Sequence, residues 1–133
     1  MSSVHPEEKH EVFCPYCGTE ASLLNGFQVY GQKALLHGWD KKNFYSCFIC
    51  DALVGCHPGT TRPLGTMANR PLRKLRGQVH EVLDRSWKKA KDKGAARLRA
   101  YGQLAEKLGI PDEECHVGMF DEQRCRDALE VLR

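Results

Sequence analysis

The sequence lacks any long apolar run. No stretch of its 133 residues approaches the roughly 18 apolar residues that a membrane span needs. Its first residues, MSSVHPEEKHEVF, hold no apolar segment either, which argues against a secretory signal peptide. We therefore expect a cytoplasmic protein without a membrane partner. Its cysteines should stay reduced and serve as metal ligands or redox groups before they form disulfides.

The sequence is also poor in motifs that support catalysis. It has no P-loop, no Gly-x-Ser-x-Gly nucleophile motif and no cluster of carboxylates that would hold magnesium. We therefore expect that the protein is not an enzyme and has no small-molecule substrate.

Acidic residues are scarce in one part of the chain. From Arg62 to Arg99 there are twelve Lys and Arg residues against three acids, a net charge of +9, whereas the remainder carries −6. Such a one-sided electrostatic field attracts polyanions, nucleic acid first among them. The alternative is a solvated helix face that keeps the protein soluble.

The pattern of the sequence changes near its middle. Strand-like segments and turns give way to helical periodicity from Asn69 onward. The strand-like half contains two Cys-x-x-Cys pairs, at residues 14–17 and 47–50, whose spacing suits a zinc site. We predict an α+β fold, in which an N-terminal zinc ribbon of short antiparallel strands packs on a C-terminal three-helix unit. The expected parts are a flexible tail at 1–11, the ribbon at 12–57, a linker loop at 58–68 and the helical unit at 69–133. Within the ribbon, Asn25-Gly26 predicts a hairpin turn that leads into a strand.

Three helices are predicted in the C-terminal half. Asn69 is a suitable N-cap for the first, which should end or break at Gly94. Residues 95–109 predict the second, with Gly109 as its stop, and Asp121 caps the last. The first helix should have an apolar stripe formed by Leu72, Leu75, Val79, Val82, Leu83, Trp87 and Ala90. The second helix should have an apolar stripe formed by Leu98, Tyr101, Leu104, Ala105 and Leu108.

Two Cys-x-x-Cys pairs are the clearest chemical signal. They lie in CPYCG at 14–18 and CFICD at 47–51. One such turn places two sulfurs on one side of an ion, and a second turn completes a tetrahedral shell. We predict that Cys14, Cys17, Cys47 and Cys50 hold one Zn²⁺. The ion should be structural, because four thiolates leave no open position for water or substrate.

Other roles for the cysteines stay open from the sequence alone. The paired cysteines could form a redox site or an iron–sulfur centre, or Cys56 or His57 could replace one sulfur in a mixed ligand set. Cys115 and His116 could join Cys56 or His57 in a second metal site, or belong to a packed connector. Cys125 lies on an apolar helix stripe, so we expect it in the core.

Several long strings together resemble a known family. They are CPYCG, YSCFICDALVGCHPGTTRPLGTMANRPLR, VHEVLDRSW, AYGQLAEKLGI and ECHVGMFDEQRC. They are similar to small zinc-finger-containing proteins found mainly in phages and prophages, over nearly the whole chain from Cys14 onward. The resemblance implies a bacterial host and no established activity. Arg70 and Pro71 depart from the family pattern, which has an acidic residue or alanine shortly after MAN.

A loop and a helix flank supply candidate phosphate contacts, namely His57, Thr60 and His80. Arg73, Arg76, His80 and Asp84 are three or four residues apart and should share one flank of the first helix. Phosphate binding is one hypothesis, and cleavage of a phosphodiester is a bolder one. The alternative is a His80–Asp84 pair that helps to pack the helix.

Nucleic-acid binding, to DNA or RNA and without strong sequence specificity, is the function that these features favour. The candidate contacts are Arg62, Arg70, Arg73, Lys74, Arg76, Lys88 and Lys89. The ribbon adds aromatic and basic residues: Phe27, Tyr30, Lys33, Trp39, Lys41, Lys42, Phe44 and Tyr45. A second hypothesis is a phage-encoded module that binds and inhibits or redirects a host protein. A metal-dependent nuclease is the third.

Overall fold

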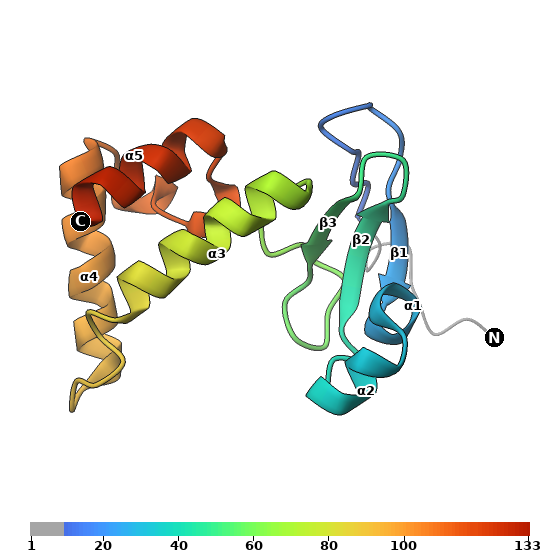
Figure 1. Ribbon diagram of the computed structural model, residues 1–133, viewed down its shortest axis with the longest axis horizontal. Coiled ribbons are helices and arrows are strands. Elements are labelled where there is room, and N and C mark those ends of the chain that lie inside the picture. Colours follow the sequence, from blue (N-terminus) through green and yellow to red (C-terminus); the bar gives the residue numbers. More distant parts are fainter. Residues whose placement is uncertain (1–9) are drawn as a thin grey trace. The chain divides into compact units, whose positions relative to one another are not determined.

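The computed structural model describes residues 10–133 (Figure 1). The chain divides into two compact units, residues 1–70 and 71–133, which are described separately below. A sheet with its cysteine pairs comes first and helices follow, so the predicted α+β class is confirmed. Most of the tail predicted at residues 1–11 lies outside the described residues.

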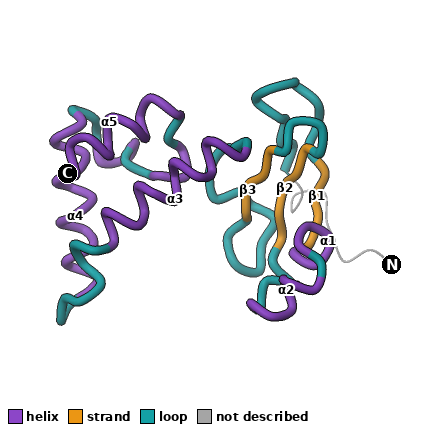
Figure 2. The backbone as a smooth tube through the Cα atoms, in the orientation of Figure 1, coloured by secondary structure: helices purple, strands orange, loops and turns teal. Residues whose placement is uncertain are grey.

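The first unit is built on a three-stranded antiparallel sheet. Its strands are β1 (Ser22–Asn25), β2 (Asn43–Cys47) and β3 (Ala52–Gly55), with β2 in the centre (Figures 1 and 2). Tyr45 lies opposite Leu23 of β1 and Val54 of β3, and its side chain is fully buried. A large aromatic ring at the centre of a short sheet supplies much of the apolar area that such a small unit can bury.

Two short helices follow β1, where the sequence had suggested a turn and a strand. They are α1 (Gly26–Tyr30) and α2 (Gln32–His37). The Asn25 side chain accepts a hydrogen bond from the backbone N–H of Gln28, and the Gln28 side chain accepts one from the backbone N–H of Asn25, both at 2.8 Å. This reciprocal capping box makes Asn25 the start of a helix, so the hairpin prediction was wrong.

The segment after β3 folds back onto the sheet. Cys56 forms a β-bridge with Pro63, and Leu53 forms one with Ala68. The Tyr45 hydroxyl donates a hydrogen bond to the carbonyl oxygen of Thr61 at 2.7 Å. Residues 58–68, predicted as a linker loop, are therefore held to β2 and β3 by hydrogen bonds.

The second unit contains the three predicted helices. They are α3 (Arg70–Asp84), α4 (Lys93–Leu108) and α5 (Glu122–Leu132), and the short 3₁₀ turns η2 (Asp112–Glu114) and η3 (Val117–Met119) join the last two. Asp92 caps α4 and Asp121 caps α5, while Gly109 ends α4 in the left-handed conformation. Within residues 10–133, no helix has the length and apolar character of a membrane span.

The first helix of this unit is shorter than predicted. It ends at Asp84, and a series of turns covers residues 85–89 before α4 begins at Lys93. The Trp87 indole N–H donates to the Asp84 carboxylate at 3.0 Å, which holds the chain in this turn. Gly94 therefore lies in the first turn of α4 and does not end α3. Leu98, predicted on the inner stripe, is 73% exposed.

Gly26 lies where two backbone segments of the first unit come together. Its N–H donates to the carbonyl oxygen of Lys42 at 2.7 Å, and the residue is buried. A Cβ atom at this position would overlap the carbonyl oxygen of Trp39 and lie 3.3 Å from Cα of Asp40. Only glycine lets the start of α1 pack this closely against residues 39–42.

We predict that Gly26→Ala destabilises the protein by about 1–3 kcal/mol, because one backbone segment must move to relieve the overlap. Thermal denaturation followed by circular dichroism should show a lower midpoint. Gly77→Ala is the matched control. A Cβ there meets no atom within 4 Å, and alanine in a helix interior should raise the midpoint. An unchanged midpoint in Gly26→Ala would contradict the close packing.

Candidate metal centre

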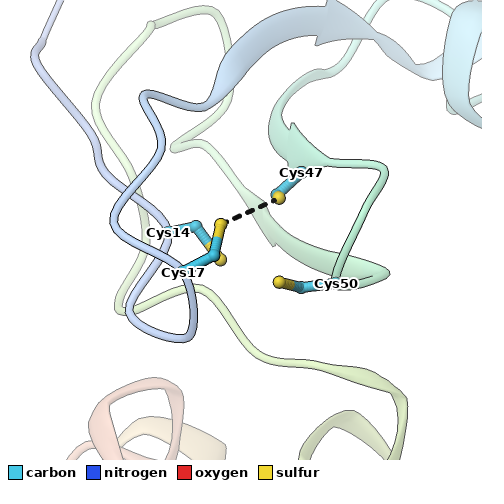
Figure 3. A group of neighbouring side chains, drawn as sticks. All are labelled: Cys14, Cys17, Cys47 and Cys50. Atoms are coloured by element: carbon cyan, nitrogen blue, oxygen red, sulfur yellow. Dashed lines mark hydrogen bonds between the residues drawn. The ribbon is translucent and has the colours of Figure 1, made fainter.

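Four thiols converge at one end of the sheet. The sulfur atoms of Cys14, Cys17, Cys47 and Cys50 all lie within 4.8 Å of one another, and the side chains point toward a common centre (Figure 3). The Cys17 and Cys47 sulfurs are 3.7 Å apart. Two sulfurs of a tetrahedral zinc site, with bonds of ~2.3 Å, are separated by ~3.8 Å. The cluster therefore fits one tetrahedrally coordinated ion.

The antiparallel sheet explains why the two pairs meet. The first pair precedes β1 and the second follows β2, so both lie at the same end of two adjacent antiparallel strands. Each Cys-x-x-Cys turn is called a knuckle below, the first at residues 14–18 and the second at residues 47–51. In the first knuckle, the Gly18 N–H donates to the carbonyl oxygen of Cys14, and the Cys14 N–H donates to that of Thr19, both at 2.8 Å. Gly18 has a φ of 77°, a conformation that glycine adopts without strain.

The second knuckle repeats this turn with a different residue. Asp51 follows Cys50 as Gly18 follows Cys17, and its φ is 52°. It is the only non-glycine residue with positive φ in the described part of the chain. Its carboxylate accepts a hydrogen bond from Nε of Arg70 at 2.9 Å, in an exposed ion pair. Arg70, predicted to contact nucleic acid, thus contacts the second knuckle.

The thiols of the cluster differ in their pKa values. Hydrogen bonds from the Thr19 side chain and backbone lower the pKa of Cys17 to about 6, and the Thr19 hydroxyl oxygen lies 3.3 Å from the Cys17 sulfur. The neighbouring Cys17, followed by burial, raises the pKa of Cys50 to about 12. Thr19 thus favours the thiolate form of Cys17, which is the form of a cysteine that binds a metal. A bound cation would take the place of the remaining protons.

Comparison with known protein families agrees with this geometry. A profile of zinc-finger-containing domains matches residues 10–133. The chain belongs to the family of zinc-finger-containing domains. Searches of curated proteins and of solved structures found no match. The family and the cluster together support a metal site in this zinc-finger-containing protein.

The three other cysteines lie outside the cluster. Cys56 is buried beside the sheet, and burial raises its pKa to about 11. Cys115 lies in the second unit with its thiol 3.5 Å from the carbonyl oxygen of Tyr101, and burial is the main cause of its raised pKa. Cys125 is fully buried in α5, as expected. Among residues 10–133, the four paired cysteines are the only group of three or more His, Cys, Asp or Glu side chains placed to hold a metal ion. This group includes neither Cys56 nor His57.

The structure separates the predicted basic contacts into different environments. Arg62, Lys74, Lys88 and Lys89 are exposed, and Arg73 is half-buried. Arg76 is only 9% exposed, and its Nε donates to the carbonyl oxygen of Phe120 at 2.9 Å. This burial removes Arg76 from the surface residues that could contact a phosphate. Its role is to satisfy a buried carbonyl group within the second unit.

Lys88 and Lys89 belong to a basic segment rather than to a helix face. The segment comprises Lys88, Lys89, Lys91, Lys93, Arg97 and Arg99, all of them exposed. Its one acidic residue, Asp92, is occupied as the N-cap of α4. The Arg97 guanidinium lies 4.6 Å from the ring centre of Tyr101 and 5.9 Å from that of Trp87. Charge is therefore concentrated where α3 gives way to α4. The sequence had instead placed Lys88, Lys89, Lys91 and Lys93 within the first helix.

The candidate phosphate contacts are distributed over both units. His57 and Thr60 form a tight turn, in which the Thr60 hydroxyl donates to the carbonyl oxygen of His57 at 2.9 Å. His80 lies on α3, and its pKa is lowered mainly by desolvation. The charges of Arg97 and Arg76 lower this pKa further, whereas the charge of Asp84 raises it. The Asp84 carboxylate accepts the Trp87 N–H, which supports a structural role for this flank.

We predict that Cys47→Ala loses its metal while Cys56→Ala retains about one zinc per chain. Both residues are buried cysteines of the first unit, and only Cys47 belongs to the cluster. Elemental analysis of protein purified without chelator provides the measurement. Full zinc content in Cys47→Ala, or loss of zinc in Cys56→Ala, would contradict the proposed ligand set.

We also predict that acid releases the metal and that Thr19→Val releases it at a higher pH. Protons compete with the metal for thiolates, so affinity falls as the pH decreases. Thr19 lowers the pKa of Cys17, and loss of its hydroxyl should raise that pKa. Changes to groups that hydrogen-bond metal ligands typically cost about 10- to 100-fold in affinity. A zinc-indicator titration from pH 8 to 4 tests this, with Thr61→Val on the loop after β3 as control. Identical release curves would refute the role of Thr19.

Proposed function

We propose that this protein binds nucleic acid, that one structural zinc ion stabilises its first unit, and that the basic segment contacts phosphates. Zinc is the ion that suits four thiolates in a closed tetrahedral shell. When bound, it would supply a cross-link between the two knuckles, and no reaction step is assigned to it. The residues that would hold it are Cys14, Cys17, Cys47 and Cys50.

The observation that carries the nucleic-acid proposal is the charge of the basic segment. Between residues 88 and 99 there are six Lys and Arg residues and one acid. Exposed lysines neutralise phosphates and release the counterions condensed on them, which favours binding regardless of sequence. Arg97, held against Tyr101, has a planar group suited to a bidentate phosphate contact. Weak sequence specificity is expected, because phosphate contacts carry no information about bases.

Binding to a host protein is the second candidate, and the first unit supplies the observation that favours it. Phe48 and Ile49, at the tip of the second knuckle, are 75% and 85% exposed, and Tyr16 of the first knuckle is 44% exposed. Exposed apolar side chains that lie close together often mark protein-binding surfaces. This candidate accords with a phage origin, in which the protein would bind and redirect a bacterial protein.

We predict that Lys88→Gln, Lys89→Gln and Lys91→Gln, combined in one variant, weaken binding to duplex DNA and reduce its salt dependence. Each phosphate contact contributes ~0.9 to the slope of log K against log salt concentration, so the slope should fall by up to ~2.7. Fluorescence anisotropy with a labelled duplex, measured from 50 to 200 mM salt, gives the slope.

The matched control is Lys33→Gln, Lys41→Gln and Lys107→Gln, which removes the same charge from exposed positions elsewhere. It should leave the slope nearly unchanged. Equal effects of the two triple variants would refute a localised contact. Absence of binding to DNA and RNA by the unmodified protein at low salt would refute the function itself and favour the host-protein candidate.

A further inference from the structure

The first unit contains an open groove at the end of the sheet opposite the metal centre. Its volume is about 390 Å³, within the range of small-ligand sites. Tyr30 at the end of α1, Trp39 in the turn before β2 and Phe44 of β2 supply aromatic rings. His57, Pro58, Gly59 and Leu64, from the segment after β3, also line it.

The aromatic rings of this groove are held in a fixed arrangement. The Tyr30 ring packs edge-to-face with Trp39 at 5.5 Å and with Phe44 at 5.7 Å, measured between ring centres. His37 stacks on Trp39 at 4.4 Å. Tyr30 is nevertheless 36% exposed, so part of its ring remains open to a ligand. Rings immobilised in this way lose little conformational entropy when a flat ligand stacks on them.

The backbone around the groove is also tied in place. The Trp39 N–H donates to the carbonyl oxygen of Ala34 at 2.8 Å, and Gly26 packs directly on residues 39–42. The Asn43 side chain donates to the carbonyl oxygen of Thr60 at 2.9 Å, which joins β2 to the loop after β3. The groove is therefore formed before any ligand arrives.

The charge of the groove indicates what kind of ligand it would accept. Of the described residues that line it, Lys42 and His57 carry basic side chains and none is acidic. Aromatic rings beside a lysine suit a ligand that combines a flat ring with a negative charge. A nucleotide has both, a base for the aromatic rings and a phosphate for Lys42.

We infer that this groove binds an unpaired nucleotide of single-stranded nucleic acid, with the base against Tyr30 and the phosphate at Lys42. The inference rests on the proposed function and deepens it. A base within a duplex is already stacked on both faces, whereas an unpaired base can enter the groove. The groove would therefore add a preference for single strands to the charge-driven binding of the basic segment.

The two tryptophans of the chain allow the two surfaces to be tested separately. Trp39 lines the groove and Trp87 lies beside the basic segment. In full-length Trp87→Phe, the remaining tryptophan reports on the groove, and in Trp39→Phe it reports on the basic segment. Oligo(dT) should quench Trp39 fluorescence, and a duplex of equal length, at equal saturation, should not. Quenching of Trp39 by a proline-rich peptide but not by oligo(dT) would overturn the inference.

Substitutions then test the contacts. Tyr30→Ala should weaken oligo(dT) binding by about 5- to 150-fold, the range found for loss of one stacked base, and change duplex binding less than twofold. Phe27→Ala is the control, because Phe27 is an exposed aromatic of the same helix that does not line the groove.

Lys42→Gln, compared with Lys41→Gln, provides a second test that leaves the aromatic packing intact. In Lys42→Gln, the slope of log K for oligo(dT) against log salt concentration should fall by ~0.7.

The outcomes distinguish the inference from the proposed function. If the unmodified protein binds oligo(dT) but Tyr30→Ala and Lys42→Gln bind it as tightly as their controls do, the groove inference is wrong and the basic segment still accounts for binding. If the unmodified protein binds neither oligo(dT) nor duplex at low salt, the proposed function is wrong and the inference fails with it.

Discussion

The convergence of four thiols is the constraint on which the first unit depends. Three short strands cannot bury enough apolar surface to fold without further cross-links. Here the antiparallel pairing of β1 and β2 brings both knuckles to one end of the sheet, and a metal held by them would fix the register of those strands. Tyr45, at the centre of β2, then packs against a sheet whose geometry is already determined.

The opposite end of the same sheet carries the groove. Phe44 is next to Tyr45, the central residue of β2, and Gly55 ends β3, so the strands that lead away from the metal centre also position the aromatic lining. Loss of metal should thus disturb a surface that contains no metal ligand. The second unit, residues 71–133, contains no such cysteine cluster. It is held by capped helices and by Arg76, which satisfies the Phe120 carbonyl group.

The sequence predicted local features well and long-range ones poorly. Short patterns predicted the four-cysteine cluster, the cap Asp121, the stop at Gly109 and the three helices. Asn25-Gly26 misled because the dipeptide is typical of hairpins, although Gln28, three residues after Asn25, was a signal for a capping box. The burial of Arg76 depends on a carbonyl group 44 residues away, which no local pattern reveals.

The end of α3 shows the same limit in another way. Trp87 continues the apolar spacing of the helix, so the sequence extended α3 through the basic residues. In the structure, the Trp87 indole N–H instead donates a hydrogen bond to Asp84, and the chain turns.

X-ray absorption at the zinc edge is the most direct test of the claim that four thiolates hold one zinc ion. The spectrum should show four sulfur ligands at ~2.3 Å and no nitrogen or oxygen ligand. A nitrogen or oxygen in the shell, or fewer than four sulfurs, would contradict it.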